Sequence, residues 1–391
     1  MKRLTVFALL FVLVASSPVY AQPLQFGSIK VYTRNLYIGT DFDSVLAAPQ
    51  EEFLRAAQEA FAEIIGTKFP QRAEALAEEI ATIRPHLIGL QEVFNFMLIP
   101  TPDEVNRNLP FIDYLETLRK ALAERGLHYR VAAVVNNIDL TFPCSLFGCP
   151  PGAEALRVLD RDVILAHIDV ETTVADLDCQ PPSADGCNYE ARLPLVLPPF
   201  LDSSVVRGFV GVDAVVHGET YRFVTTHLEV REAVGQDGTA AQRAQAVELV
   251  DTIGRVTPPK RPVILVGDFN SEPTDSGDSP YNIIRNAAYA DTWKQNILKS
   301  RIPGGFTCCQ DSDLNNNASL LDERVDIIFV KNNFGVLPFS LPGLVFSVVV
   351  GDEPISDLQP KWSSDHAGPF ALLHAIPLFE RHDSPRGGST E

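Results

Sequence analysis

Acidic, amide and histidine side chains interrupt six apolar runs of this sequence, close to where each run begins or ends. In VILVGDFN (263–270), aliphatic residues run directly into Asp268 and Asn270. The same pattern places Asn35 after IKVYTR, Glu92 after LIGLQ, His227 after YRFVTT, Asp326 inside RVDIIFV and Asp365-His366 before AGPFALL. Burying a polar group that lacks a hydrogen-bond partner raises the free energy of the folded state. We therefore expect the ends of these segments to converge on one cleft.

The residue types indicate which cation and which reaction such a cleft would serve. Glu92, Asp268, Asp326 and Asp365 offer carboxylates, and Asn35 and Asn270 offer amides, without clustered Cys/His spacing. Hard oxygen ligands favour Mg²⁺, with Mn²⁺ or Ca²⁺ as alternatives, and argue against zinc. Facing acids repel an anionic substrate unless a cation offsets them, and a nearby histidine can donate to a charged oxygen. This combination is what phosphoester hydrolysis requires.

Strands alternate with a few helices along the chain. Apolar residues three and four apart predict helices over 51–64, 70–83, 111–125 and 240–255. Strands are expected at 28–36, 86–93, 128–135, 162–170, 207–217, 221–230, 263–270, 324–330, 344–350 and 367–373, with a hairpin turn at 218–220. Residues 136–160 and 176–205, rich in Pro, Gly and Cys, are predicted to be long surface loops. The pattern favours one α+β domain of packed sheets covered by helices.

Six short motifs resemble, in order, those of the endonuclease/exonuclease/phosphatase superfamily. They are NL (35–36), LQEV (90–93), THLEV (226–230), GDFN (267–270), RVDIIFV (324–330) and SDH (364–366). That superfamily includes deoxyribonuclease-I-like nucleases, abasic-site endonucleases, neutral sphingomyelinases and inositol-polyphosphate 5-phosphatases. Each motif is weak alone, but the ordered set is specific. The resemblance implies a four-layer α/β/β/α sandwich, in which two mixed β-sheets pack face to face with helices outside and the site lies at the sheet ends.

The resemblance also implies roles for the motif residues. Glu92 is expected to be the main metal ligand, assisted by Asn35 and Asp365. Asp268 is expected to orient or deprotonate the attacking water, and Asn270 to bind a phosphate oxygen.

The histidines have expected roles as well. His366 would contact the scissile phosphate, with Asp326 as its carboxylate partner. His227 is typical of the nuclease-I-like and sphingomyelinase branches and could protonate the leaving oxygen. Two weaker substrate-binding candidates keep structural alternatives: Arg207 could bind phosphate or form a salt bridge, and Asp162 could touch substrate or lie on the surface where a strand begins.

The N-terminal segment has the order of a secretory signal peptide. Lys2 and Arg3 precede an apolar run from Leu4 to Ala15, and small residues precede Gln22. This predicts a signal peptide at 1–21, a catalytic domain at 22–380, a disordered tail at 381–391 and a secreted protein, extracellular or periplasmic. No later segment is long and apolar enough to suggest a transmembrane span.

Charge and cysteine content constrain the partners and the compartment. The formal charge is −18, and losing Lys2 and Arg3 would make it −20. Such a surface provides no basic groove for tight nucleic-acid binding, although it permits cleavage in the presence of divalent cations. Six cysteines fit an oxidising compartment. Cys144/Cys149 and Cys179/Cys187 are close enough to close local loops, Cys308 and Cys309 are adjacent, and the pairing stays open.

The favoured function is a secreted, divalent-metal-dependent phosphodiesterase, acting on nucleic acid, phospholipid or a small phosphodiester, without a stable protein partner. One alternative is an inositol-polyphosphate-type phosphatase, although basic residues that would grip extra phosphates are not evident. The other is a non-catalytic binding protein with the same fold. Because all principal motif positions are intact, the sequence favours the enzyme.

Overall fold

The computed structural model describes residues 28–374 except 43–44, 46, 50, 105–111, 147–148, 180–181, 184, 198–200, 234–235, 297–303, 332–344 and 356–358. The predicted signal peptide (1–21) and the predicted tail (381–391) lie outside the described residues. Within the described part of the chain, no helix has both the length and the apolar character needed to cross a membrane.

Two mixed β-sheets form the centre of the protein. The first has the order β19 (Val345–Val350), β20 (Gly368–His374), β1 (Ser28–Asn35), β2 (Leu87–Gln91), β6 (Ala153–His167), β3 (Asn95–Pro100) and β4 (Ile112–Asp113), and β5 (Tyr129–Pro143) also pairs with β6. The second has the order β17 (Ala290–Asp291), β18 (Asp326–Lys331), β16 (Val263–Asp268), β13 (Glu219–His227), β12 (Gly208–Val216), β9 (Gly186–Asn188) and β8 (Pro182–Ser183), and β7 (Glu171–Val174) pairs with β12. Small hairpins are formed by β10 (Leu193–Leu197) with β11 (Leu201–Val205) and by β14 (Glu232–Ala233) with β15 (Gln236–Asp237).

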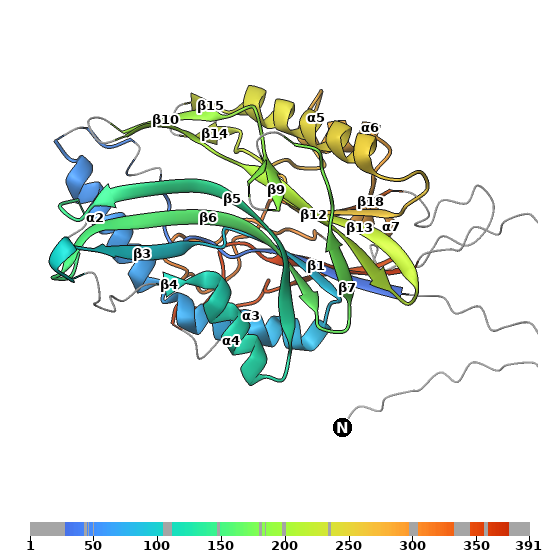
Figure 1. The fold of residues 1–391 in the computed structure, drawn as a ribbon, viewed down its shortest axis with the longest axis horizontal. Helices are drawn as coiled ribbons and strands as arrows, with labels where there is room; N and C mark the ends of the chain where they lie inside the picture. The colour runs from blue at the N-terminus through green and yellow to red at the C-terminus, as the bar shows by residue number, and fades with distance from the viewer. Residues whose placement is uncertain are drawn as a thin grey trace, which may run out of the picture.

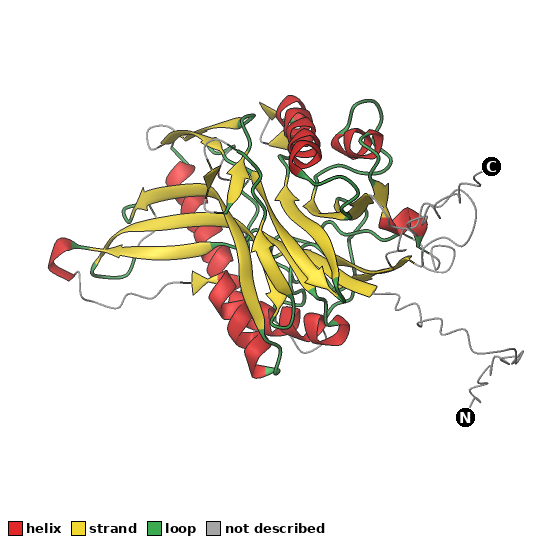
Figure 2. Cartoon of the chain, turned by 45° about the vertical axis from the view of Figure 1, so that its right-hand side comes forward, coloured by secondary structure: helices red, strands yellow, loops and turns green. Residues whose placement is uncertain are grey.

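The two sheets pack face to face, and helices cover their outer faces. One buried cluster joins aliphatic side chains of β1, β2 and β6 to those of β12 and β16 and to Tyr221 and Phe223 of β13. A second cluster packs α3 (Phe69–Ile83) and α4 (Tyr114–Glu124) on the first sheet, and a third packs α5 (Thr239–Val256) and α6 (Pro280–Asn286) on the second. Figures 1 and 2 show these helices on opposite sides of the strands. The predicted four-layer α+β sandwich is confirmed.

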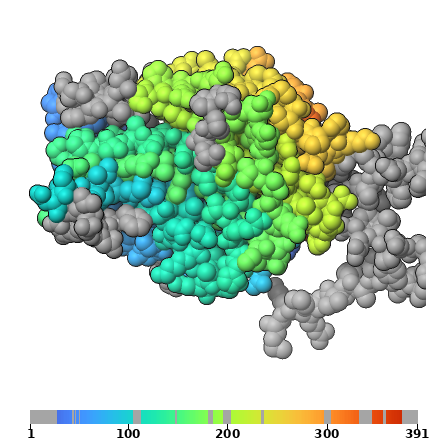
Figure 3. Space-filling model, in the orientation of Figure 1, coloured from blue at the N-terminus to red at the C-terminus, as the bar shows by residue number. Residues whose placement is uncertain are grey.

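The other helices lie at the margins of this sandwich. They are α2 (Phe53–Gly66), the 3-10 helix η1 (Pro102–Glu104) and the short α7 (Thr292–Gln295). In the space-filling view, the chain near α5 (yellow) and the chain near α4 (teal) form opposite sides of the molecule (Figure 3).

Local sequence signals explain where several elements begin. The side chain of Asp113 accepts hydrogen bonds from the N–H groups of Leu115 and Glu116, so α4 begins at Tyr114 rather than at the predicted residue 111. His217 and Gly218 both have positive φ, and they form the β12–β13 turn one residue earlier than predicted. Positive φ at both central residues matches the right-handed twist of the flanking strands.

The prediction of long surface loops at 136–160 and 176–205 is largely wrong. Most of the first segment belongs to the β5–β6 hairpin, where Asn136 pairs with Arg161 and Pro143 with Ala155. The second segment contains β8 to β11. Disulfides join Cys144 to Cys149 and Cys179 to Cys187, so the Pro, Gly and Cys content marks the turns between strands rather than whole loops.

Candidate active site

Strand direction and register bring the predicted residues to one edge of the sandwich. β1 and β2 are parallel, and Asn35 at the end of β1 pairs with Gln91, which precedes Glu92. β13 and β16 are also parallel, with His227 opposite Asp268. Two antiparallel neighbours begin at the same edge, since β18 starts with Asp326 opposite Asp268 and β20 follows His366. The strand register therefore brings these strand ends together, as the sequence predicted.

Asn35 links the two sheets through its side-chain amide. Its Nδ2 donates to Glu92 Oε1 at 3.0 Å and to Asp268 Oδ2 at 3.2 Å. The other carboxylate oxygen of Glu92 accepts from the N–H of Ile38 at 2.9 Å. Glu92 has φ 54°, a left-handed conformation that a non-glycine residue rarely adopts. Such backbone conformations persist where surrounding contacts fix a functional side chain.

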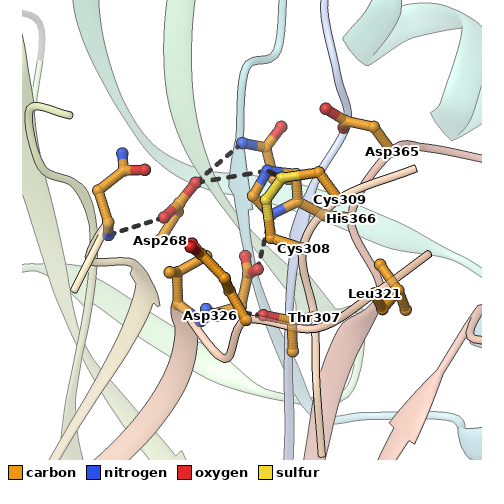
Figure 4. Close-up of a disulfide and its surroundings, with 12 residues drawn as sticks. Asp268, Thr307, Cys308, Cys309, Leu321, Asp326, Asp365 and His366 are labelled. Atoms are coloured by element: carbon orange, nitrogen blue, oxygen red, sulfur yellow. Dashed lines mark hydrogen bonds and ion pairs between the residues drawn. A yellow bond between two sulfur atoms is a disulfide. The ribbon is translucent and has the colours of Figure 1, made fainter. Parts of the chain in front are cut away.

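His366 lies between two carboxylates from neighbouring strands. Its Nδ1 is 2.7 Å from Asp326 Oδ2, and its Nε2 is 3.8 Å from Asp268 Oδ2 (Figure 4). Burial lowers the pKa of His366, but attraction to Asp326 and Asp365 outweighs burial and raises that pKa well above its ordinary value. Arg34 fixes the loop, because its Nη1 donates to the His366 carbonyl at 2.5 Å. The ring is therefore held in one orientation with Nε2 toward Asp268.

The environment of His227 differs from that of His366. Arg207 Nη1 is 2.9 Å from His227 Nδ1. A guanidinium can only donate, so Nδ1 accepts and the neutral ring carries its proton on Nε2. Burial, then the charges of Arg207 and His366, lower the pKa of His227 well below its ordinary value. Nε2 lies 3.5 Å from Asp268 Oδ2. This geometry presents the Nε2 N–H of His227 on the Asp268 side of the site.

Asn270 is fixed next to both residues. Its N–H donates to Asp268 Oδ1 at 2.9 Å, and its Nδ2 donates to the Leu228 carbonyl at 2.9 Å. Nδ2 also lies 3.3 Å from His227 Nε2, and because both atoms carry protons in this tautomer the approach is a close contact of two donors rather than a hydrogen bond. The side chain is thus positioned as a donor beside Asp268.

Asp162 is not a surface residue, so that structural alternative is wrong. It is fully buried in β6, two residues after Asp160, and Asn137 is the polar side chain beside both carboxylates. Burial and the neighbouring Asp160 raise the pKa of Asp162 well above its ordinary value. Arg207 Nη1 lies 3.9 Å from Asp160 Oδ2. Arg207 therefore joins this acidic pair to His227.

The oxygen-rich cluster suits a hard divalent cation. Asp268, Asp326 and His366 each offer a ligand atom within 4.8 Å of the others, and the buried Asp326 Oδ1 has no hydrogen-bond partner among the described residues. Burial, and then repulsion from Glu92 and Asp326, raise the pKa of Asp365 to about 7 despite the opposing charge of His366. Acids held this close need a cation to stay ionised together.

The three expected metal ligands are not equally close to this cluster. Asn35 and Glu92 are in direct contact with each other. The Asp365 side chain instead accepts from Ser364 Oγ at 3.3 Å, and Figure 4 shows it at the margin of the group.

Several residues that shape the site were not predicted from the sequence. Arg34 is a charged residue inside the predicted strand 28–36, which is the signal used for the motif residues, whereas Asp160 ends the segment that was predicted to be a loop. Thr307 Oγ1 accepts from the N–H of Asp326 at 3.0 Å. Cys308 and Cys309, noted only as adjacent, form a disulfide beside His366. Thr307, Cys308 and Cys309 were missed because they lie far in sequence from the motifs.

Comparison with known proteins identifies the family. The sequence model described as "Endonuclease/Exonuclease/phosphatase family" matches residues 66–366, which include every motif after Asn35. Truncated TDP2 from Caenorhabditis elegans is 16% identical, with a TM-score of 0.47 over 89% of this chain and 98% of that chain. Endonuclease/exonuclease/phosphatase proteins from Bacteroides thetaiotaomicron and Bacteroides vulgatus are 15% and 17% identical, with TM-scores of 0.48 and 0.47 over 90% and 89% of this chain and 100% and 99% of theirs. No curated protein sequence matches the chain.

The family match covers most of the chain and strands of both sheets, and five of the six ordered motifs lie within it. Members of this family are typically metal-dependent phosphoester hydrolases. The chain belongs to the endonuclease/exonuclease/phosphatase family.

Proposed function

We propose that the protein is a secreted, divalent-metal-dependent phosphodiesterase. The observation that carries the proposal is the pairing of Asp268 with Asp326 across two strands, with the His366 ring in contact with both carboxylates. A cation at Glu92, Asn35 and Asp365, Mg²⁺ or alternatively Mn²⁺ or Ca²⁺, would supply charge neutralisation at the phosphate.

Asp268 has the surroundings of a water-positioning base. Its Oδ1 is fixed by the N–H of Asn270, whereas Oδ2 faces Asn35, His227 and His366 at 3.2, 3.5 and 3.8 Å. A water bound to Oδ2 would therefore lie among donors that also orient a phosphoryl group. Hydrogen-bond reach of this kind is the first requirement for a general base.

The three donors, His366, His227 and Asn270, would have different roles at the phosphate. His366, held as a cation by Asp326, would stabilise the charge that develops on a non-bridging oxygen. Neutral His227 and Asn270 would donate hydrogen bonds to the phosphoryl or leaving oxygen. Arg207 would keep His227 in the required tautomer. In this scheme Asp162 contributes to the charge balance behind the site rather than to a direct substrate contact.

A substrate panel tests the proposal. We would incubate the mature protein with plasmid DNA, RNA, sphingomyelin vesicles, an inositol polyphosphate and a chromogenic phosphodiester, with Mg²⁺, with Mn²⁺ and with chelator. Asp268→Asn and His366→Ala should each lower kcat by about 10²–10⁴ without loss of fold. Asp169→Asn is a matched control, because its side chain is 84% exposed in a turn after β6.

The outcomes separate the alternatives. Chelator-sensitive turnover of a phosphodiester, lost in both variants, would support the proposal and identify the substrate class. Turnover of the inositol polyphosphate alone would favour a phosphatase. Absence of turnover together with absence of Mg²⁺ binding would favour a binding protein, and full activity of a folded Asp268→Asn variant would rule out the assigned mechanism.

A further inference from the structure

The adjacent residues Cys308 and Cys309 lie in a segment that connects two parts of the site. Just before them, Thr307 Oγ1 accepts from the N–H of Asp326 at 3.0 Å. Just after them, the N–H of Gln310 donates to the Asp365 carbonyl at 2.8 Å. The Cys308–Cys309 pair is therefore anchored between β18 and the loop that carries His366.

The sulfur atoms face the ring nitrogen that the proposed reaction uses. Cys309 Sγ is 3.9 Å from His366 Nε2, and Cys308, Cys309 and the His366 ring each offer a ligand atom within 4.8 Å of the others (Figure 4). Cys308 is buried, whereas Cys309 is exposed. A small reductant can therefore reach the pair from solvent.

The Asp326 contact makes His366 a suitable metal ligand. Nδ1 is committed to Asp326 Oδ2 at 2.7 Å, so Nε2 is the nitrogen left to bind. Histidines that bind metals through one nitrogen usually donate the other N–H to a carboxylate, which fixes the ring. Thiolates and imidazole prefer a soft or borderline cation such as zinc, unlike the oxygen ligands of the hard-cation site.

We propose that Cys308, Cys309 and His366 form a second, redox-controlled metal site for a thiophilic divalent cation such as Zn²⁺ or Cd²⁺. In the disulfide form the sulfurs have no thiolate to offer. A phosphine reductant donates two electrons and takes up oxygen from water, so the disulfide becomes two thiols and the phosphine becomes its oxide. Cation binding then displaces one proton from each thiol and the Nε2 proton of the His366 imidazolium, and the Nε2 lone pair that this frees binds the cation. Asp268 Oδ2, 3.8 Å from Nε2, or a water completes four ligands.

Occupation of this site would inhibit the enzyme. A cation bound to Nε2 prevents His366 from contacting the phosphate. Zinc would therefore stop turnover by the reduced protein and leave turnover by the oxidised protein unchanged. This consequence rests on the proposed function, but the metal site itself does not. Metal binding must therefore be measured separately from activity.

The experiment is a Cd²⁺ titration of oxidised and phosphine-reduced full chain, followed by thiolate-to-metal charge-transfer absorption. Because reduction also opens the other disulfides, the informative protein replaces Cys144, Cys149, Cys179 and Cys187 with serine and keeps only Cys308 and Cys309. This four-serine variant should bind one Cd²⁺ after reduction and none before. Cys308→Ser/Cys309→Ser in the natural background should lose one equivalent of Cd²⁺, and His366→Ala in the four-serine background should bind at least about 10-fold more weakly.

Three results would overturn the proposal. These are no charge-transfer signal from the reduced, folded four-serine variant, an unchanged stoichiometry in Cys308→Ser/Cys309→Ser, and an unchanged Cd²⁺ affinity in His366→Ala. If the four-serine variant does not fold, the comparison of the reduced natural chain with Cys308→Ser/Cys309→Ser decides alone. A positive titration in a protein that hydrolyses none of the panel would support the metal site and reject the proposed function.

Discussion

At the scale of the residue, two histidines of the same site differ because of one contact each. His366 has a carboxylate at Nδ1, and His227 has a guanidinium at Nδ1. A carboxylate stabilises the charged ring, whereas a guanidinium excludes a proton from the nitrogen it contacts. The pair can thus provide one cationic and one neutral donor at the same phosphate.

Asp326→Asn tests the first of these contacts. An asparagine amide can donate to Nδ1, which would move the ring proton to Nε2 and remove the carboxylate charge. We expect kcat on the substrate found by the panel to fall by about 10²–10⁴, with KM changed little. Steady-state kinetics with Asp169→Asn as control checks this. A folded Asp326→Asn protein with at least half the natural kcat would show that the contact has no catalytic role.

The sequence could indicate which polar residues matter but not how they contact each other. Asp268, Asp326 and His366 could be predicted because each interrupts an apolar strand near one end. The burial of Asp162 and the contact of Arg207 with His227 depend on the register of β6, β12 and β13 across the sheets. Such distances are tertiary properties, and no local pattern encodes them.

At the scale of the element, β16 requires a glycine immediately before Asp268. Gly267 has φ 145°, and an added Cβ would lie 2.0 Å from the Thr226 carbonyl oxygen of β13. This close approach of β16 to β13 lets Asp268 lie next to His227. Helices over 51–64, 70–83 and 240–255 were predictable from their 3.6-residue periodicity. Strands at 128–135 and 162–170 were predicted as well, but the rest of the β5–β6 hairpin was not, because its polar outer face and its Pro and Cys turn have the composition of a loop.

Gly267→Ala should therefore lower the free energy of unfolding by about 3 kcal/mol, through strain and a clash with backbone. Urea denaturation measures this as a shift in midpoint at unchanged slope. Gly254→Ala is the matched control, because Gly254 lies exposed in α5 with nothing within 4 Å of an added Cβ. It should be neutral or stabilising by up to about 1 kcal/mol. Equal effects of the two substitutions would contradict the strand argument.

At the scale of the whole molecule, a histidine cluster joins the sheets at the end opposite the site. His86 precedes β2, and its Nδ1 accepts from the N–H of Lys30 at 3.1 Å. Its ring meets that of His217, in the β12–β13 turn of the other sheet, with centroids 5.8 Å apart. Burial, and then the charges of His217, Lys30 and His167, lower the pKa of His86 to about 4. Protonation there would place a positive charge between the sheets.

The pH dependence of stability should reflect this cluster. An unfolded histidine titrates near about 6.5, so between that pH and about 4 the unfolded chain binds a proton that folded His86 does not. His86 therefore contributes stability above pH of about 6.5, and that stability is lost as the pH falls toward 4. His86→Asn keeps an acceptor for Lys30 but cannot titrate, so its unfolding free energy should fall less steeply over this range. Urea denaturation at several pH values, with exposed His128→Asn as control, measures the slopes. If His86→Asn and His128→Asn both show the same slope as the natural protein, the histidine cluster does not contribute to the pH dependence of the unfolding free energy.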